Sequence, residues 1–349
     1  MPYINLYLPN IDINKNEVHV VYWNRDLNTE DLSAFSGLKL HEFRCYQEDD
    51  VAKYKKISSF IQYRKFVKSI INSYEFDKFI ILHTMPGVLL YDEFCRLRGK
   101  FILDYRDSTY EGFAPFKRMV GNLVKWSAAT FVSSDGFRKY LPNSESHKTY
   151  TVHNILQESL SHQEDREKRL IPSDKIRLAF WGFIRHEEIN KQLIKQISQD
   201  LRFELHYYGR EQKIAEALKI YTNQLNASNI FFHGEYKPED RYQFILQTDC
   251  IHNIYCDDNT MLAMGNKYYD GIVFRIPQVC MPGSFMGKMC KTHKIGIELN
   301  PYESTFTEEL YAYLSNIGNI NLINNCNNEI SRVLKEQNTA NQAIINLLS

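Results

Sequence analysis

The stretch that decides the fold is Ile176–Lys191, with the sequence IRLAFWGFIRHEEINK. Ile176–Trp181 is mostly apolar, as expected of a parallel strand covered on both faces. Gly182 permits a tight turn, and apolar residues recur at helical spacing from Glu187 onward. A helix that begins directly after a strand presents unpaired backbone N–H groups and a positive dipole end, which favour an anion. Arg185 lies at this end, so the stretch predicts a phosphate site. The alternative is an ordinary strand–helix turn at which Arg185 is only a surface charge.

The composition limits the classes of function. The chain has 349 residues, enough for two domains of ordinary size. Lysine plus arginine equals aspartate plus glutamate, at 42 each, so nothing indicates a nucleic-acid partner. The seven cysteines have no metal-ligand spacing, and we expect reduced thiols, no metal site and a cytoplasmic location. We find no signal-peptide pattern and no stretch that approaches the roughly 20 apolar residues of a membrane span.

Strands alternate with helices through both halves of the chain, which indicates an α/β protein with parallel sheets. We expect strands at residues 18–23, 38–43, 78–82, 101–105, 129–133 and 149–153, and again at 176–181, 202–208, 229–233, 249–255, 278–281 and 295–299. We expect helices at 55–74, from the Pro86–Gly87 turn to Leu97, and at 135–140, 187–197, 211–225, 238–247, 267–274 and 329–348. A polar stretch at 159–174 separates a first domain, 1–158, from a second, 172–328. The last helix, 329–349, is a candidate to cross back to the first domain.

Two chemically active side chains follow strands of the first half. Asp104 ends the strand at 101–105, and His83 follows the strand at 78–82. The carboxyl ends of parallel strands meet at one edge of a sheet, where α/β proteins bind ligands. The alternatives are an Asp104–Arg106 pair that only holds a loop in place, and a structural role for His83.

A third cluster is NKYYDG at residues 266–271. On a helix, Asn266 and Asp270 are four residues apart and share a face, with Lys267 beside them. A carboxylate can accept hydrogen bonds from two ribose hydroxyls, and a lysine can neutralise a diphosphate. The alternative is a solvated helix face. The sequence contains no GxGxxG, GxxxxGK[ST], GxSxG or HExxH motif, which argues against a nicotinamide dehydrogenase and a P-loop NTPase.

In their order along the chain, these segments resemble a known family. The segments are FILDYRD at 101–107, ATFVSSDGFRKYLP at 129–142, TYTVHNI at 149–155, LAFWGFIRHEEINK at 178–191 and NKYYDGIVFRIPQV at 266–279. Together they resemble the GT-B glycosyltransferases of the group-1 (family 4) set, which build bacterial surface polysaccharides. The resemblance implies two Rossmann-like domains whose parallel sheets face a central cleft.

The resemblance also implies an enzyme of the glycosyltransferase class and a role for each residue. The donor is a nucleoside-diphosphate sugar in the second domain, and neither a metal nor a cofactor is needed. Arg185, Lys267, His83 and Asp104 are the implied catalytic residues. The implied donor contacts are Gly182, Phe183, Arg185, Lys191, Asn266, Lys267, Asp270 and Gly283. Asp270 would bind the ribose, Gly283 would offer a backbone N–H, and the acceptor would enter near His83 and Asp104. The family retains the anomeric configuration.

The implied partner is a glycan or lipid-linked saccharide acceptor in capsule, O-antigen or exopolysaccharide synthesis. Residues 116–126 combine apolar and basic positions, which fits peripheral contact with the cytoplasmic face of the inner membrane, or an ordinary helix packed on its own sheet. Two other functions stay open. A non-catalytic GT-B binding or scaffolding subunit is favoured by Ala263, where the family has a first glutamate, and by the short segment 1–17. A GT-B sugar-nucleotide epimerase would need no acceptor.

Overall fold

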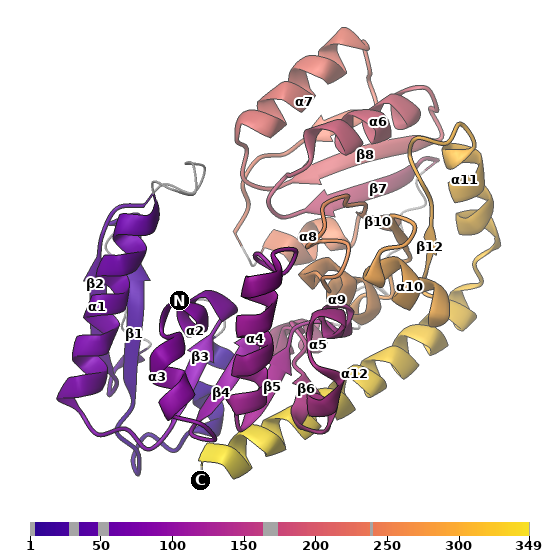
Figure 1. Cartoon of the computed structure of the whole chain (residues 1–349). Helices are drawn as coiled ribbons and strands as arrows, with labels where there is room; N and C mark the ends of the chain where they lie inside the picture. The colour runs from indigo at the N-terminus through magenta and orange to yellow at the C-terminus, as the bar shows by residue number, and fades with distance from the viewer. Residues whose placement is uncertain (1–3, 28–34, 48–55, 163–173, 238–239, 349) are drawn as a thin grey trace. The chain divides into compact units, whose positions relative to one another are not determined.

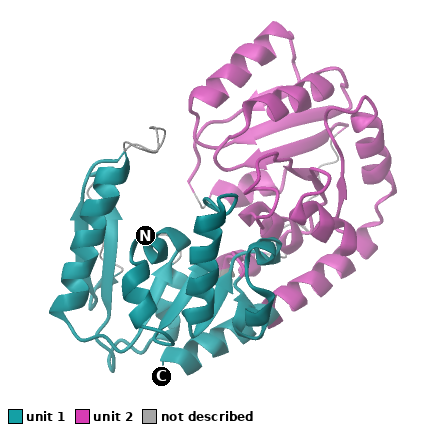
Figure 2. Cartoon of the chain, in the orientation of Figure 1, with its two compact units in different colours: residues 1–152, 336–349 teal, residues 153–335 magenta. Residues whose placement is uncertain are grey.

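The computed structural model describes residues 4–27, 35–47, 56–162, 174–237 and 240–348. It divides into two compact units (Figure 2). Unit 1 contains residues 1–152 together with 336–349, and unit 2 contains residues 153–335. The last helix, α12 (Asn319–Leu348), therefore contributes to both units, and the first unit ends before residue 158.

Unit 1 contains two parallel sheets among its described residues. Strands β1 (His19–Asn24) and β2 (Lys39–Arg44) form a pair, and β3 (Phe79–Leu82), β4 (Phe101–Tyr105), β5 (Ala129–Val132) and β6 (Thr149–Thr151) form a four-stranded sheet in sequence order. Its helices are α1 (Ile57–Ser73), α2 (Thr84–Leu89), α3 (Tyr91–Arg96) and α4 (Ala114–Trp126), with a 3₁₀-helix, η5 (Asp135–Tyr140). Residues 340 and 344 of α12 complete the core that β4, β5 and Tyr7 share.

Unit 2 is one six-stranded parallel sheet in the order β12-β11-β10-β7-β8-β9. The strands are β7 (Ile176–Trp181), β8 (Phe203–Tyr208), β9 (Ile230–Phe232), β10 (Cys250–Asn253), β11 (Gln278–Cys280) and β12 (Gly296–Glu298). The helices are α5 (Gln157–Ser161), α6 (Glu187–Ser198), α7 (Lys213–Gln224), α8 (Arg241–Ile245), α9 (Asn266–Val273), α10 (Phe285–Thr292) and α11 (Phe306–Asn316), followed by α12. Counted from β7, the strand order is that of a Rossmann sheet, and the order reverses between β7 and β10.

Apart from Arg177, strand β7 is apolar, and its last four residues are buried because both faces of the sheet are covered. Leu178 and Phe180 pack into a core with α6, α7 and α11. Ala179 and Trp181 point to the other face, into a core with α8, α9, α10 and α12. Figure 1 shows α6 and α7 together on one side of β7 and β8. The expectation of a doubly covered parallel strand is confirmed.

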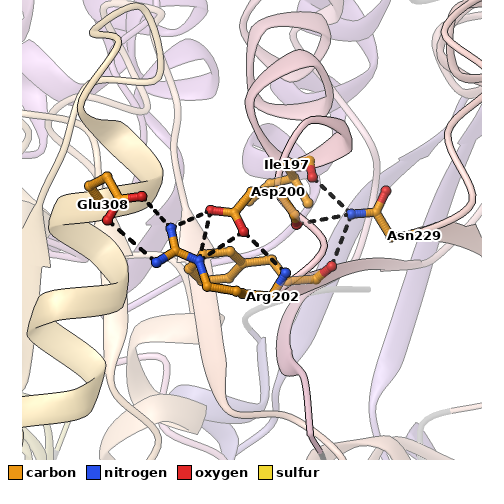
Figure 3. Close-up of polar contacts among 6 residues, drawn as sticks. Ile197, Asp200, Arg202, Asn229 and Glu308 are labelled. Carbon is orange, nitrogen blue, oxygen red and sulfur yellow. Dashed lines mark hydrogen bonds and ion pairs between the residues drawn. The ribbon is translucent and has the colours of Figure 1, made fainter.

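The amino end of β8 is held by a polar network (Figure 3). Arg202 contacts the carboxylates of Asp200 and of Glu308 on α11, with Nη2–oxygen distances of 2.7 and 2.5 Å. Asn229 Nδ2 donates to the backbone carbonyls of Ile197 and Asp200 at 2.8 and 3.3 Å. These contacts join α6, β8 and α11 at the end of the sheet away from the β7 turn.

The predicted strands are confirmed to within two residues at each end, but some helices differ. The single helix expected after the Pro86–Gly87 turn is wrong, because α2 begins at Thr84 and contains that dipeptide. A proline in the first turn of a helix gives up an N–H that has no intrahelical partner, so it does not stop the helix. Helices α10 and α11 were not expected, and α12 begins at Asn319 instead of 329. The asparagine-rich start of α12 has low helix propensity and is stabilised by burial of Leu322 and Cys326.

Candidate functional site

Because the strand order reverses between β7 and β10, the carboxyl ends of these two strands are the candidate ligand site. The chain leaves these neighbouring strands toward opposite faces of the sheet, where α6 covers one face and α9 the other. His186, which precedes α6, lies 3.0 Å from Asp257 (Nε2 to Oδ2) and joins the two loops. Burial lowers the pKa of His186, so this contact involves mostly neutral imidazole at pH 7.

The turn after β7 is built on close backbone contact. Gly182 has a φ of +123°, which favours glycine. A Cβ added to Gly209, in the turn after β8, would lie 1.8 Å from the carbonyl oxygen of Gly182. The turn brings Arg185 to the surface, where its guanidinium lies 5.1 Å from the ring centre of the exposed Phe183. Arg185 has no ion-pair partner among the residues that the structure describes.

Lys267, in the first turn of α9, is the central charge of the site. Its side chain is buried, and Nζ lies 4.1 Å from the ring centre of Phe180 on β7 and 5.3 Å from that of Tyr255 after β10. Nζ is also 3.7 Å from the position that a Cβ on Gly182 would occupy. No carboxylate oxygen of the described residues lies within ion-pair distance. The pKa of Lys267 is lowered to about 7, mainly by burial, with Asp270 opposing the shift and Arg185 adding to it.

Asp270 lies one helical turn after Lys267 and is buried. Its Oδ2 accepts a hydrogen bond of 2.8 Å from Trp181 Nε1, and its Oδ1 lies 3.6 Å from Arg241 Nη1. Arg241 in turn donates to Ser159 Oγ at 2.9 Å. Burial raises the pKa of Asp270, against the effects of Arg241, Trp181 and Lys267. Each carboxylate oxygen has two lone pairs, so both can still accept one more hydrogen bond.

The structure brings Gly182, Phe183, Arg185, Lys267 and Asp270 together at the end of β7, and it places three other expected residues differently. Lys191 forms an ion pair of 2.6 Å with Glu187 on its own helix and lies 5.9 Å from the ring centre of Tyr221 on α7. Gly283 donates its backbone N–H to Glu298 Oε1 at 3.1 Å, so an internal carboxylate already takes that donor. Asn266 is exposed at the first position of α9.

His83 and Asp104 are neighbours at the carboxyl edge of the four-stranded sheet of unit 1. The His83 backbone N–H donates to the Asp104 carbonyl at 3.0 Å. His83 Nδ1 accepts from the Met85 N–H at 3.3 Å and caps α2. Asp104 is fully buried, and its Oδ2 accepts from Arg106 Nε at 2.8 Å. Burial raises the pKa of Asp104 and lowers that of His83. These contacts match the alternative in which the Asp104–Arg106 pair holds the loop.

Four residues of the site were not expected from the sequence: Trp181, Arg241, His252 and Tyr255. Trp181 and Tyr255 read as core positions of apolar strands. His252 lies in β10, stacked 4.9 Å from Phe180, and burial lowers its pKa to about 3. One signal in the sequence could have indicated Trp181, which directly precedes the glycine that ends the strand. A buried indole N–H needs a hydrogen-bond partner, so a polar residue could be expected near it.

The site thus presents two cations that have no carboxylate partner among the described residues, together with an anchored carboxylate and aromatic walls. Such a set can bind a diphosphate through the cations and a hydroxyl-bearing group through the carboxylate. In the part of the chain that the structure describes, no group of three or more histidine, cysteine, aspartate or glutamate residues is placed to hold a metal ion. The same part contains no helix with the length and apolar character needed to cross a membrane.

Solved structures resemble this chain over nearly its whole length. Sucrose-phosphate synthase from Thermosynechococcus elongatus matches with a TM-score of 0.68 and 12% identity, covering 94% of this chain and 86% of its own. WaaG, a glycosyltransferase involved in lipopolysaccharide biosynthesis, matches with a TM-score of 0.61 and 11% identity over 98% and 94%. Anabaena HepE in complex with UDP-glucose matches with a TM-score of 0.59 and 14% identity over 91% and 87%. No protein-family model and no curated protein matches the sequence. The chain has the GT-B fold, as the sequence predicted.

Proposed function

We propose that this protein is a glycosyltransferase that binds a nucleoside-diphosphate sugar at the carboxyl ends of β7 and β10 and transfers the sugar to an acceptor. The observation that carries the proposal is Lys267. It is a buried cation, 9% exposed, with aromatic neighbours and no carboxylate within ion-pair distance among the described residues. A buried charge without a partner is costly, and sites that carry one are enriched in function.

A diphosphate supplies the charge that this cluster lacks. Arg185 and Lys267 are close enough for Arg185 to lower the pKa of Lys267, so the two cations repel each other until an anion binds. When the bond between the sugar and the diphosphate breaks, negative charge develops on the departing phosphate. Fixed cations aimed at that charge stabilise the transition state more than the ground state. We assign this role to Arg185 and Lys267 and propose that transfer needs no metal ion.

Asp270 is the proposed ligand of the ribose hydroxyls. Trp181 and Arg241 hold its two oxygens in fixed positions, which reduces the entropy lost when a ligand binds. Gly182 and Phe183 form the turn beside the phosphates. Lys191 and Gly283 are left out of the proposal, because both are engaged elsewhere in unit 2.

The solved structures support the donor class, since one of them is a complex with UDP-glucose. The proposed acceptor is a glycan or lipid-linked saccharide of a surface polysaccharide, which accords with the lipopolysaccharide role of WaaG. We also propose cytoplasmic action, with peripheral contact at the inner membrane, and retention of the anomeric configuration. These proposals follow from the resemblance of the sequence to the family. The anomeric configuration of the product, determined by NMR, tests retention.

The test is release of nucleoside diphosphate from a panel of UDP-, GDP- and dTDP-sugars, with and without saccharide acceptors. Arg185→Ala should reduce turnover by at least about a hundredfold, in the range seen when one charge-stabilising donor is lost from an active site. Lys191→Ala, on the same segment but outside the cluster, should leave turnover within about twofold. Equal turnover in wild type and Arg185→Ala would contradict the proposed role.

A non-catalytic nucleotide-sugar-binding subunit is the second candidate. The observation that favours it is the buried Asp104–Arg106 pair, because a carboxylate in that state is not available as a base in unit 1. Tight donor binding without release of nucleoside diphosphate, with any acceptor of the panel, would select this second function.

A further inference from the structure

An open groove on the surface of unit 1 has no role in the donor site. Its volume is about 380 Å³, within the range of small-molecule sites. One wall is a single face of α4, with residues spaced three and four apart, and the other is the segment that ends η5. The lining residues are Ala114, Lys117, Arg118, Gly121, Lys139, Tyr140, Leu141 and Pro142.

The groove is strongly basic in a chain whose net charge is zero. Lys117, Arg118 and Lys139 line it, and no acidic residue does. None of these three forms an ion pair within the described part of the chain, whereas the neighbouring Arg138 and Lys148 pair with Asp135 and Glu145. The groove also lies at the start of α4, where the helix dipole adds positive potential. Within the described ranges, the three cations therefore lack an internal anion.

Tyr140 positions two of these cations. The ammonium groups of Lys117 and Lys139 lie 5.8 and 4.9 Å from the centre of its ring. Cation–π contacts from both walls limit the rotamers of two side chains that are otherwise free in solvent. A ligand that binds between them loses less entropy than one that must order two free lysines.

Beside the cations the groove has an apolar part, formed by Ala114, Leu141 and Pro142. A Cβ on Gly121 would lie 3.6 Å from Pro142 Cγ, in ordinary van der Waals contact, so a longer side chain at this position would fill space in the groove. We propose that this groove binds a phosphate ester, with the phosphate between Lys117, Arg118 and Lys139 and the organic part against Leu141 and Pro142. Lysine ammonium groups and an arginine fork are the side chains suited to phosphate oxygens. The inference does not depend on the donor site of unit 2.

A footprint on the wild-type protein locates the ligand directly. Exposed lysines are acetylated briefly with and without glucose 1-phosphate at low ionic strength, and the modified sites are quantified by mass spectrometry. Lys117 and Lys139 should be protected, while Lys65 on α1 and Lys100 before β4, which are also exposed, should react equally in both samples. The proposal is overturned if each of the four lysines is acetylated to the same extent with and without millimolar glucose 1-phosphate.

Two kinds of variant separate charge from shape. Lys117→Glu/Lys139→Glu should weaken glucose 1-phosphate binding by at least about tenfold, since two attractions become repulsions. Gly121→Leu should weaken it similarly by filling the groove, and it leaves the charge unchanged and raises helix propensity, so α4 should still fold. Lys65→Glu/Lys100→Glu carries the same change in charge outside the groove and should bind as wild type does. The proposed phosphate pocket is contradicted if this control variant loses binding, or if Gly121→Leu binds glucose 1-phosphate as tightly as wild type does.

Vesicles distinguish a soluble phosphate ester from a lipid head group. The probe is a set of vesicles of neutral lipid with and without anionic phosphatidylglycerol. If the ligand is a head group held in the groove, Gly121→Leu reduces vesicle binding and glucose 1-phosphate competes with it. A different result would overturn the proposed pocket: vesicle binding that falls with the charge reversal but is unchanged by Gly121→Leu and by glucose 1-phosphate. Such binding would be an electrostatic contact with the surface that does not involve the groove.

Discussion

The indole N–H of Trp181 donates a hydrogen bond of 2.8 Å to Oδ2 of Asp270. Trp181 is the last residue of β7, and Asp270 lies on α9, 89 positions away in sequence. The bond therefore fixes α9 to the strand whose end forms the proposed donor site. Lys267 lies one turn before Asp270 on the same helix, with Nζ 4.1 Å from the ring centre of Phe180.

Removing the indole donor should reduce both stability and nucleotide affinity. Trp181→Phe leaves a buried carboxylate oxygen without its hydrogen bond, which costs about 1–3 kcal/mol in the free energy of unfolding. Urea denaturation measures this loss. Trp126→Phe is the matched control, because its indole N–H has no hydrogen-bond partner within the described residues. An equal loss in both variants would show that ring volume, and not the hydrogen bond, matters.

Donor affinity should depend on pH through Lys267. Its pKa of about 7 in the free protein means that the ammonium form dominates below pH 7 and the neutral amine above it. A bound diphosphate favours the ammonium form and raises the pKa, so binding above pH 7 takes up a proton. The affinity for UDP-glucose, whose diphosphate does not titrate near neutrality, should fall up to about tenfold per pH unit above pH 7.

Calorimetry in buffers with different ionisation enthalpies measures that proton uptake. Lys267→Arg is the control, since arginine stays protonated across this range, and its affinity should not change between pH 6 and 8.5. A wild-type affinity that is constant over this range would exclude Lys267 as a diphosphate ligand with a lowered pKa.

The same lysine should lower the stability of the unliganded protein. Its pKa is about 7 when folded and near the model value of 10.5 when unfolded, so between these values the unfolded state binds more protons. The contribution of Lys267 to stability therefore becomes less unfavourable as pH rises from 7 to 10. Lys267→Met should stabilise the protein at pH 7 by about 1–4 kcal/mol, as replacement of buried charges by apolar groups often does. Lys191→Met should change the free energy of unfolding by less than about 0.5 kcal/mol.

The contact between the β7 and β8 turns should not tolerate a methyl group. Gly209→Ala places a Cβ on the Gly182 carbonyl oxygen, at 1.8 Å, and the backbone must move. We expect a loss of about 2–4 kcal/mol in the free energy of unfolding and weaker donor binding. Gly112→Ala is the control, because its Cβ would have no atom within 4 Å. Comparable stability of the two variants would contradict the described turn.

The sequence predicted the fold well because its signals are local. Apart from Arg177, strand β7 is apolar on both faces, Gly182 follows its last residue, and the helical spacing of α6 comes next, so this turn could be located from one segment. Arg185 could be placed at the start of α6 because it lies between Gly182 and Glu187 in the sequence. Lys267 and Asp270 could be named as candidates because both lie on one predicted helix.

Contacts between segments that are distant in the sequence could not be predicted from local patterns. Nothing in the spacing shows that Trp181 and Arg241 take the oxygens of Asp270, or that Glu298 takes the N–H of Gly283. Lys191 follows the turn closely in sequence, but one residue of a helix is a rotation of about 100°, and it faces α7 instead of the site. Asn190, its neighbour, is buried and binds the carbonyl of Arg185.

The central claim is that Lys267 contacts the diphosphate of the donor. Its most direct test is equilibrium binding of UDP-, GDP- and dTDP-sugars to wild type, Lys267→Met and Lys191→Met at pH 6.5, by calorimetry. The account predicts that one nucleotide class binds wild type and Lys191→Met equally, and that Lys267→Met binds it about 10–100-fold more weakly despite a higher melting temperature. Equal affinity in Lys267→Met, or no binding of any nucleotide to the wild type, would contradict it.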